Sequence, residues 1–153
     1  MSSTTNLQVA MTFLAKIGSD ASPDEVAALF SSDLDWNIPG DAGVLPWVGH
    51  KTGRRAVADF VRDSGRMIER ISFEVHDVLA NNDRAVILGG LSSRIKSTGR
   101  IIDTAFAMVL TIAGSEITRF VMLEDSFETS RAARDAGLRS APSPRRAKAP
   151  TSS

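Results

Sequence analysis

Carboxylates and two histidines are nearly the only side chains in this sequence that could move a proton. The chain contains no cysteine and no tyrosine, so neither a thiolate nor a phenol is available. Glu124 and Asp125 end an alternating segment, and alternation places them on opposite faces of a strand. Glu124 shares its face with Phe120 and Met122, and burial beside them would raise its pKa toward that of a useful general base. The alternative is an ion pair between Glu124 and a surface base such as Arg119.

Three further groups are candidates for acid or base chemistry. Asp41 lies between Trp36 and Trp47, and His50 lies between Trp47 and a helical pattern. Both belong to a Pro/Gly-rich segment, where they could stand at the mouth of a pocket. Alternatively, Asp41 is a turn residue and His50 is an exposed histidine. Asp103 begins an otherwise apolar segment. It either lies at a pocket mouth or pairs with Arg94 or Arg100.

Metal, phosphate and serine-nucleophile motifs are missing from the sequence. His50 and His76 are far apart, and the scattered acids give no recognisable ligand spacing. Gly89-Gly90 lies inside an apolar run without the strand-turn-helix context of a phosphate loop, and favours a bulge or close packing. No Gly-x-Ser-x-Gly elbow occurs. We therefore expect no metal and no cofactor.

The hydrophobic period changes along the chain, from helical spacing to alternation. Ser22, Pro23 and Glu25 form a strong helix-start signal. Turns at 81–83, 97–99 and 113–115 then separate long alternating runs, as in an antiparallel meander. Helices followed by a meander predict an α+β fold with the helices on one face of the sheet. The expected helices span 5–17, about 23–30, 53–65 and 127–136, and the expected strands 34–38, 71–75, 84–95, 101–112 and 116–125.

One stretch, residues 29–61, also resembles a known family. It reads as a phenylalanine, an acidic turn, Trp-x-x-Pro-Gly from Trp36, and then Gly-x-x-x-Gly-Arg from Gly49 leading into an amphipathic helix. This run resembles the SnoaL-like branch of the NTF2-like superfamily, and the resemblance covers roughly residues 6–127. It implies a cone in which N-terminal helices pack on the concave face of a curved antiparallel sheet and leave an apolar pocket.

The resemblance implies an enzyme that acts without a cofactor on an apolar, cyclic small molecule. Its relatives include polyketide cyclases, ketosteroid isomerases and limonene-epoxide hydrolases. Alignment puts Ile38 where ketosteroid isomerases carry their base, and Gly89, Leu91 and Met122 near the epoxide hydrolases' Asp-Arg-Asp positions. Because none of these four residues can act as an acid or base, the catalytic group is expected elsewhere. We expect proton abstraction next to a carbonyl by Glu124, Asp103 or Asp41, giving isomerisation, cyclisation or dehydration. The alternatives are an epoxide hydrolase-like hydrolase and a binding or interaction module without chemistry.

The pocket is expected to have aromatic and aliphatic walls. The strand that carries Trp36 leads directly into the loop, and Trp47 could form part of a lid. Strand 101–112 is apolar on both faces, so one of its faces can line the cavity. The expected substrate-binding residues are Trp36, Ile38, Trp47, Phe60, Phe106 and Met122.

Composition sets the domain organisation and the expected partners. The 153 residues include 18 basic and 18 acidic ones, but residues 138–153 are basic, Pro-rich and without acids. We expect one domain over residues 1–137 and a disordered tail over 138–153. The body is acidic overall, which argues against a nucleic-acid surface. No apolar run is long enough for a membrane span, and a cytoplasmic location is the default. The doubly apolar strand also predicts a homodimer through the outer face of the sheet.

Overall fold

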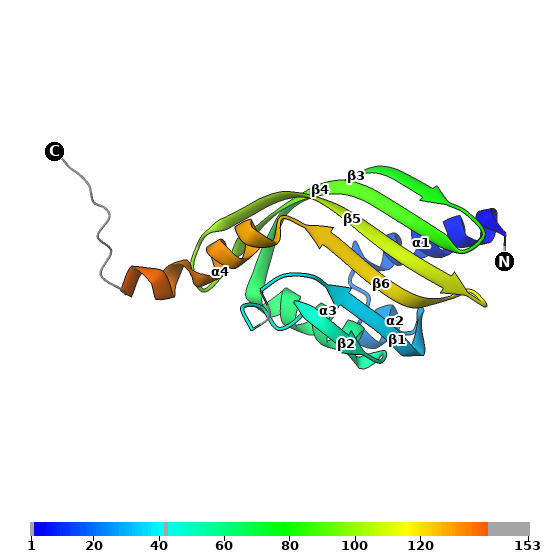
Figure 1. The fold of residues 1–153 in the computed structure, drawn as a ribbon, viewed down its shortest axis with the longest axis horizontal. Helices are drawn as coiled ribbons and strands as arrows, with labels where there is room; N and C mark the ends of the chain where they lie inside the picture. Colours follow the sequence, from blue (N-terminus) through cyan, green and yellow to red (C-terminus); the bar gives the residue numbers. More distant parts are fainter. Residues whose placement is uncertain (1, 42, 141–153) are drawn as a thin grey trace.

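In the computed structural model, which describes residues 2–41 and 43–140, helices pack against one face of a strongly curved sheet (Figure 1). This arrangement confirms the predicted α+β cone. Six strands form the sheet in the order β2-β1-β6-β5-β4-β3. The elements are, in chain order, α1 (Ser3–Ile17), α2 (Pro23–Ala27), β1 (Phe30–Ile38), β2 (Gly49–Thr52), α3 (Arg55–Met67), β3 (Ile68–Ala80), β4 (Arg84–Ile95), β5 (Ile101–Ala113), β6 (Glu116–Glu124) and α4 (Ser126–Ser140).

The sheet is mixed rather than wholly antiparallel. Strands β3 to β6 form the predicted antiparallel meander, but β1 joins β6 in parallel. Strand β2, which pairs with β1, was not predicted, because Gly49-His-Lys-Thr52 is short and has no apolar alternation. Strand β1 also starts at Phe30, earlier than the predicted position 34, because α2 ends at Ala27.

The pairing of β3 with β4 shifts its register at two places, and the two strands approach each other closely at one glycine of β4. The β3–β4 register shifts between Arg70 and Ser72 and again between Val75 and Asp77. A Cβ atom at Gly89 would collide with the carbonyl oxygen of Glu74. Only glycine can occupy that position without a shift of the backbone. The prediction of close packing at Gly89 is therefore confirmed.

The helix starts follow local capping chemistry where the sequence provides it. The Ser22 hydroxyl accepts from the Glu25 amide at 3.2 Å, and the Glu25 carboxylate accepts from the Ser22 amide at 2.8 Å, which completes the predicted capping box. Helix α3, predicted to begin at residue 53, begins two residues later. Thr52 ends β2, and α3 begins at Arg55 without a side-chain cap.

Helix α4 is longer than predicted. It continues past Gly137 to Ser140, three residues into the segment expected to be a tail. The remainder of that segment, residues 141–153, lies outside the described residues. Among the described residues, no helix has the length and apolar character needed to cross a membrane.

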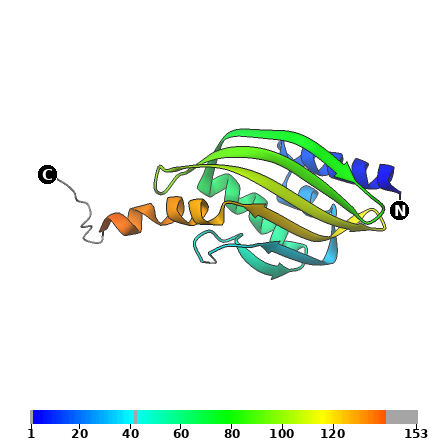
Figure 2. The same ribbon diagram turned by 45° about the horizontal axis from the view of Figure 1, so that its top comes forward.

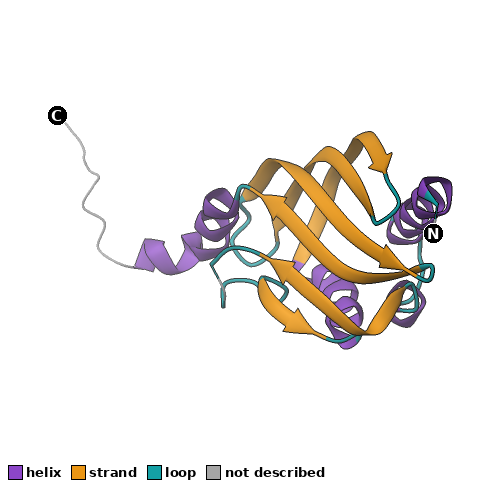
Figure 3. Cartoon of the chain, turned by 45° about the vertical axis from the view of Figure 1, so that its right-hand side comes forward, coloured by secondary structure: helices purple, strands orange, loops and turns teal. Residues whose placement is uncertain are grey.

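The outer face of the sheet carries an uncovered apolar row. Leu79, Val86, Val109 and Val121 are register partners across strands β3 to β6, and directly opposed residues share a face. Leu123, beside this row, is 48% exposed. Helices α1, α2 and α3 lie on the opposite, concave face (Figures 2 and 3).

Candidate functional site

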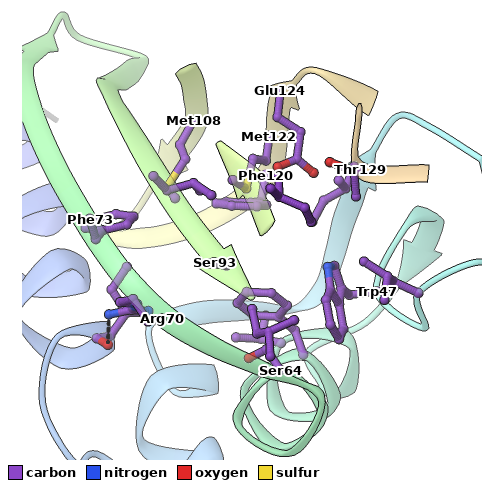
Figure 4. Close-up of a pocket in the computed structure, with 18 of the residues that line it drawn as sticks. Trp47, Ser64, Arg70, Phe73, Ser93, Met108, Phe120, Met122, Glu124 and Thr129 are labelled. Atoms are coloured by element: carbon purple, nitrogen blue, oxygen red, sulfur yellow. Dashed lines mark hydrogen bonds between the residues drawn. The ribbon is translucent and has the colours of Figure 1, made fainter. Parts of the chain in front are cut away.

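An apolar cavity of about 110 Å³ lies between the concave face of the sheet and the helices (Figure 4). Its volume is well above the ~10–15 Å³ that one water requires. Strand β1, the following loop, α3 and β6 each contribute walls. Five of the six residues expected to bind substrate line it: Trp36, Ile38, Trp47, Phe60 and Met122.

Aromatic packing shapes one wall of this cavity. Trp36 stacks on Phe120 with ring centroids 4.8 Å apart and an interplanar angle of 22°. Phe60 packs against both Trp36 and Trp47. The indole Nε1 of Trp36 donates to the backbone oxygen of Trp47 at 3.1 Å. This bond satisfies the buried donor and ties the loop to β1, so the wall toward the cavity is rigid and apolar.

Phe106 takes a different position from the one expected. It is buried but lies behind the cavity wall, where its ring stacks on Phe73 at 5.1 Å. Phe73 and Met108 line the cavity instead. Sequence reasoning missed Phe73 because the two register shifts in β3 interrupt the simple alternation that would assign its face.

Glu124 brings a carboxylate to the edge of the apolar cavity. It ends β6 on the same face as Phe120 and Met122, and Figure 4 shows it pointing toward the cavity. Burial, and to a smaller extent the charge of Asp125, raises the pKa of Glu124 to about 7. Within the described part of the chain no hydrogen bond or ion pair offsets that burial. A carboxylate of this pKa can take up and release a proton near neutral pH.

The residues after Glu124 hold the strand end in place. The Asp125 amide donates to Thr104 Oγ1 at 3.0 Å, which joins β6 to β5. The Asp125 carboxylate accepts from the Glu128 amide at 3.0 Å, so Asp125 caps α4. Thr129 lines the cavity, and its hydroxyl donates to the Asp125 backbone oxygen at 3.1 Å. Asp125 thus has a structural role that positions Glu124.

Asp41 fastens a loop to α4 and does not line this cavity. Its carboxylate accepts from Ser130 Oγ at 2.7 Å and from Arg134 Nε at 2.8 Å. The hydrogen bond from Arg134, followed by that from Ser130, lowers the pKa of Asp41. A carboxylate held ionised in this way is a weak base. Its position favours a role in holding α4 over the cavity end.

His50 and Asp103 both lie outside the cavity, so the structure does not bring them to Glu124. The His50 side chain is 66% exposed, and its Nε2 lies 2.5 Å from Asp35 Oδ1. Asp103 is exposed on the outer face of β5, opposite Ser92 of β4. Alternation already contained this information, because a strand that points Phe106 inward must point Asp103 outward.

A second polar region lies across the cavity from Glu124. Arg70, Ser64, Ser72 and Ser93 contribute to the lining, and Figure 4 shows Arg70 and Ser64 on the side away from Glu124. The register shift between Arg70 and Ser72 explains why alternation could not assign these two residues to the cavity. Among the described residues, no three histidine, aspartate or glutamate side chains gather in a position to hold a metal ion.

Comparisons with known proteins agree with this geometry. The family model of the SnoaL-like domain matches residues 13–120. An NTF2-like protein from Burkholderia xenovorans is 27% identical, with a TM-score of 0.76 over 87% of this chain and 98% of that one. No curated protein matches.

Two more distant solved structures show the same fold. A Catenulispora acidiphila protein with a ketosteroid isomerase-like fold, in complex with trimethylamine, is 18% identical, with a TM-score of 0.61 over 74% of this chain and 82% of that one. TerC, co-crystallised with polyporic acid, is 15% identical, with a TM-score of 0.71 over 85% of this chain and 98% of that one.

Proposed function

The chain belongs to the SnoaL-like family, and on that premise we propose that it is a cofactor-independent enzyme acting on an apolar, cyclic small molecule. Its reaction begins with removal of a proton from a carbon next to a carbonyl group. The observation that carries this proposal is the carboxylate of Glu124 at the edge of an apolar cavity, with its pKa raised to about 7. Such a group is ionised often enough to accept a proton and basic enough to hold it.

The proposed reaction requires the apolar walls of the cavity as well as the base Glu124. The aromatic residues exclude water and bind an apolar ring, so the negative charge of Glu124 is poorly solvated and reactive. Proton transfer to Glu124 leaves an enolate on the substrate. If the enolate is conjugated with a double bond, return of the proton from Glu124 to the far carbon gives an isomer. Attack of the enolate on a second carbonyl closes a ring, and the alkoxide that forms takes the proton from Glu124. Loss of a leaving group, which departs with that proton, gives an elimination product.

A hydroxyl in the cavity is left for a polar group of the ligand. Ser93 is buried and lines the cavity, and its hydroxyl makes no hydrogen bond to another described residue. It can donate to an oxygen of a ligand on the side of the cavity away from Glu124. Small-molecule binding is also consistent with the fold, since relatives of the same fold are solved with trimethylamine and with polyporic acid.

We expect the protein to catalyse exchange of an α-proton for solvent deuterium in some members of a panel of cyclic ketones, followed by NMR. The rate should rise as pH increases through about 7, because the base must be ionised and Glu124 titrates there. A rate that falls over this range would show that Glu124 acts as an acid. Hydrolysis of cyclic epoxides without exchange would favour the hydrolase alternative, and ligand binding without either reaction a binding module.

We also propose a homodimer through the outer face of the sheet. The row from Leu79 to Val121, together with Leu123, leaves apolar surface uncovered, and such patches mark interfaces. We expect light scattering at micromolar concentration to show a dimer. Leu123→Glu should shift it toward the monomer, because it buries a charge in the interface. Leu7→Glu on α1, where the leucine is 38% exposed, is the matched control and should remain dimeric.

A further inference from the structure

A second, more open hollow, which we call the vestibule, lies beside the cavity at the surface. The vestibule has a volume of about 320 Å³ and lies between the end of α1, α3 and the start of β3. It shares part of its lining with the cavity, so the two hollows adjoin along a common set of side chains. The shared residues are Ile17, Val26, Phe60, Ser64, Ile68 and Arg70.

The vestibule is positively charged. Its lining includes Lys16 and Arg70 and contains no aspartate or glutamate. Most of the described arginines have a carboxylate partner, such as Glu69 for Arg94. Arg70 has no carboxylate partner among the described residues. It is thus a cation at the boundary between vestibule and cavity whose charge is not already neutralised.

Two contacts hold the Arg70 guanidinium in position. Its carbon atom lies 5.1 Å from the centroid of the Phe73 ring, which itself lines the cavity. Its Nη1 donates to the backbone oxygen of Ile17 at 3.5 Å, at the end of α1. A guanidinium has five N–H donors, so several remain for a ligand. The planar fork is suited to the two oxygens of a carboxylate.

The two charged groups therefore stand at opposite sides of the apolar space. Figure 4 shows Glu124 on one side and Arg70 on the other, with the aromatic walls between them. A ligand anion is attracted to Arg70, which is exposed to solvent, and is repelled by ionised Glu124, whose burial strengthens that repulsion. This polarity would admit an anionic ligand in one orientation only.

We propose that the substrate is an apolar ring compound carrying a carboxylate, held by Arg70 at the vestibule with its reacting carbon directed to Glu124. The inference rests on the proposed function for the role of Glu124. It adds the substrate class, the entry path and the residue that selects both. Arg70 is then a binding residue that determines specificity, and the ring occupies the space between Phe73 and the tryptophan wall.

Binding of two matched probes tests this assignment without knowledge of the substrate. The probes are 2-naphthoate and its uncharged analogue 2-naphthamide, titrated by calorimetry near pH 8. We expect 2-naphthoate to bind the wild type about three to ten times more tightly, which is the range for a charge-assisted bond at a partly exposed site. Arg70→Gln should remove this preference, and Arg70→Lys should retain part of it.

Arg66→Gln is the matched control. Arg66 is an exposed arginine of α3 that lies near Asp63 and lines neither the cavity nor the vestibule. Its replacement changes the net charge by the same amount as Arg70→Gln. The Arg66→Gln variant should keep the preference for 2-naphthoate. An equal loss in Arg66→Gln and Arg70→Gln would overturn the proposal, because only the overall charge would then matter.

The comparison of the two probes on the wild type needs no variant, so misfolding of Arg70→Gln cannot obscure it. Equal affinity for the two probes contradicts the assignment of Arg70. The proposed function is judged separately, by α-proton exchange of neutral ketones and by its dependence on Glu124. If neither probe binds, the vestibule is not the route for a ring carboxylate, and the inference is wrong.

Discussion

Replacement of Glu124 by glutamine is expected to reduce turnover by on the order of 10²–10⁴, the usual contribution of a single general base. Glutamine keeps the shape of the side chain but cannot accept the proton. Glu124 is the carboxylate that lines the apolar cavity, whereas Asp103 lies on the outer face. The measurement is the α-proton exchange rate of the best ketone substrate, for the wild type and the variant at pH 8.

Two aspartate variants serve as comparisons for this loss. Asp103→Asn should retain full turnover, because its carboxylate lies away from the cavity. Asp41→Asn removes the acceptor of Arg134 and should change turnover less than Glu124→Gln, through looser attachment of α4. If Glu124→Gln kept near-full turnover, the carboxylate mechanism proposed for this site would be wrong.

The same Glu124→Gln variant should be more stable than the wild type at alkaline pH. Burial raises the pKa of Glu124 from its ordinary value of 4.5 to about 7, so the folded protein holds this proton more tightly than the unfolded chain. The resulting stabilisation is fully present below pH 4.5 and is lost as pH rises through about 7. By linkage, the loss between these limits is about 3 kcal/mol.

Urea unfolding at pH 5 and pH 8 measures this effect. The free energy of unfolding of Glu124→Gln relative to wild type should increase by about 2–3 kcal/mol between the two pH values. Asp103→Asn is the control, and its difference from wild type should change little. Parallel pH dependence for wild type and Glu124→Gln would show that Glu124 is well solvated in the folded protein. Lost turnover together with gained stability is the pattern typical of a strained functional group.

Local patterns were sufficient to predict the fold class and family. The capping box at Ser22 and Glu25, the alternation of the later strands and the turns between them depend on neighbours in sequence, and the structure confirms them. Alternation also placed Glu124 on the same face as Phe120 and Met122. The parallel pairing of β1 with β6 and the short strand β2 were missed, because pairing between distant segments leaves no local pattern.

The sequence by itself determined that proton transfer would fall to a carboxylate or to one of two histidines, and that Glu124 shares a strand face with apolar residues. Only the tertiary structure decided which face of each strand is enclosed, and so separated Glu124 from Asp103. It also decided that Asp41 meets Arg134 and that Arg70 enters the cavity lining. The physical reason is that charge–charge contacts and burial depend on distance in space, whereas periodicity reports only the neighbours along the chain.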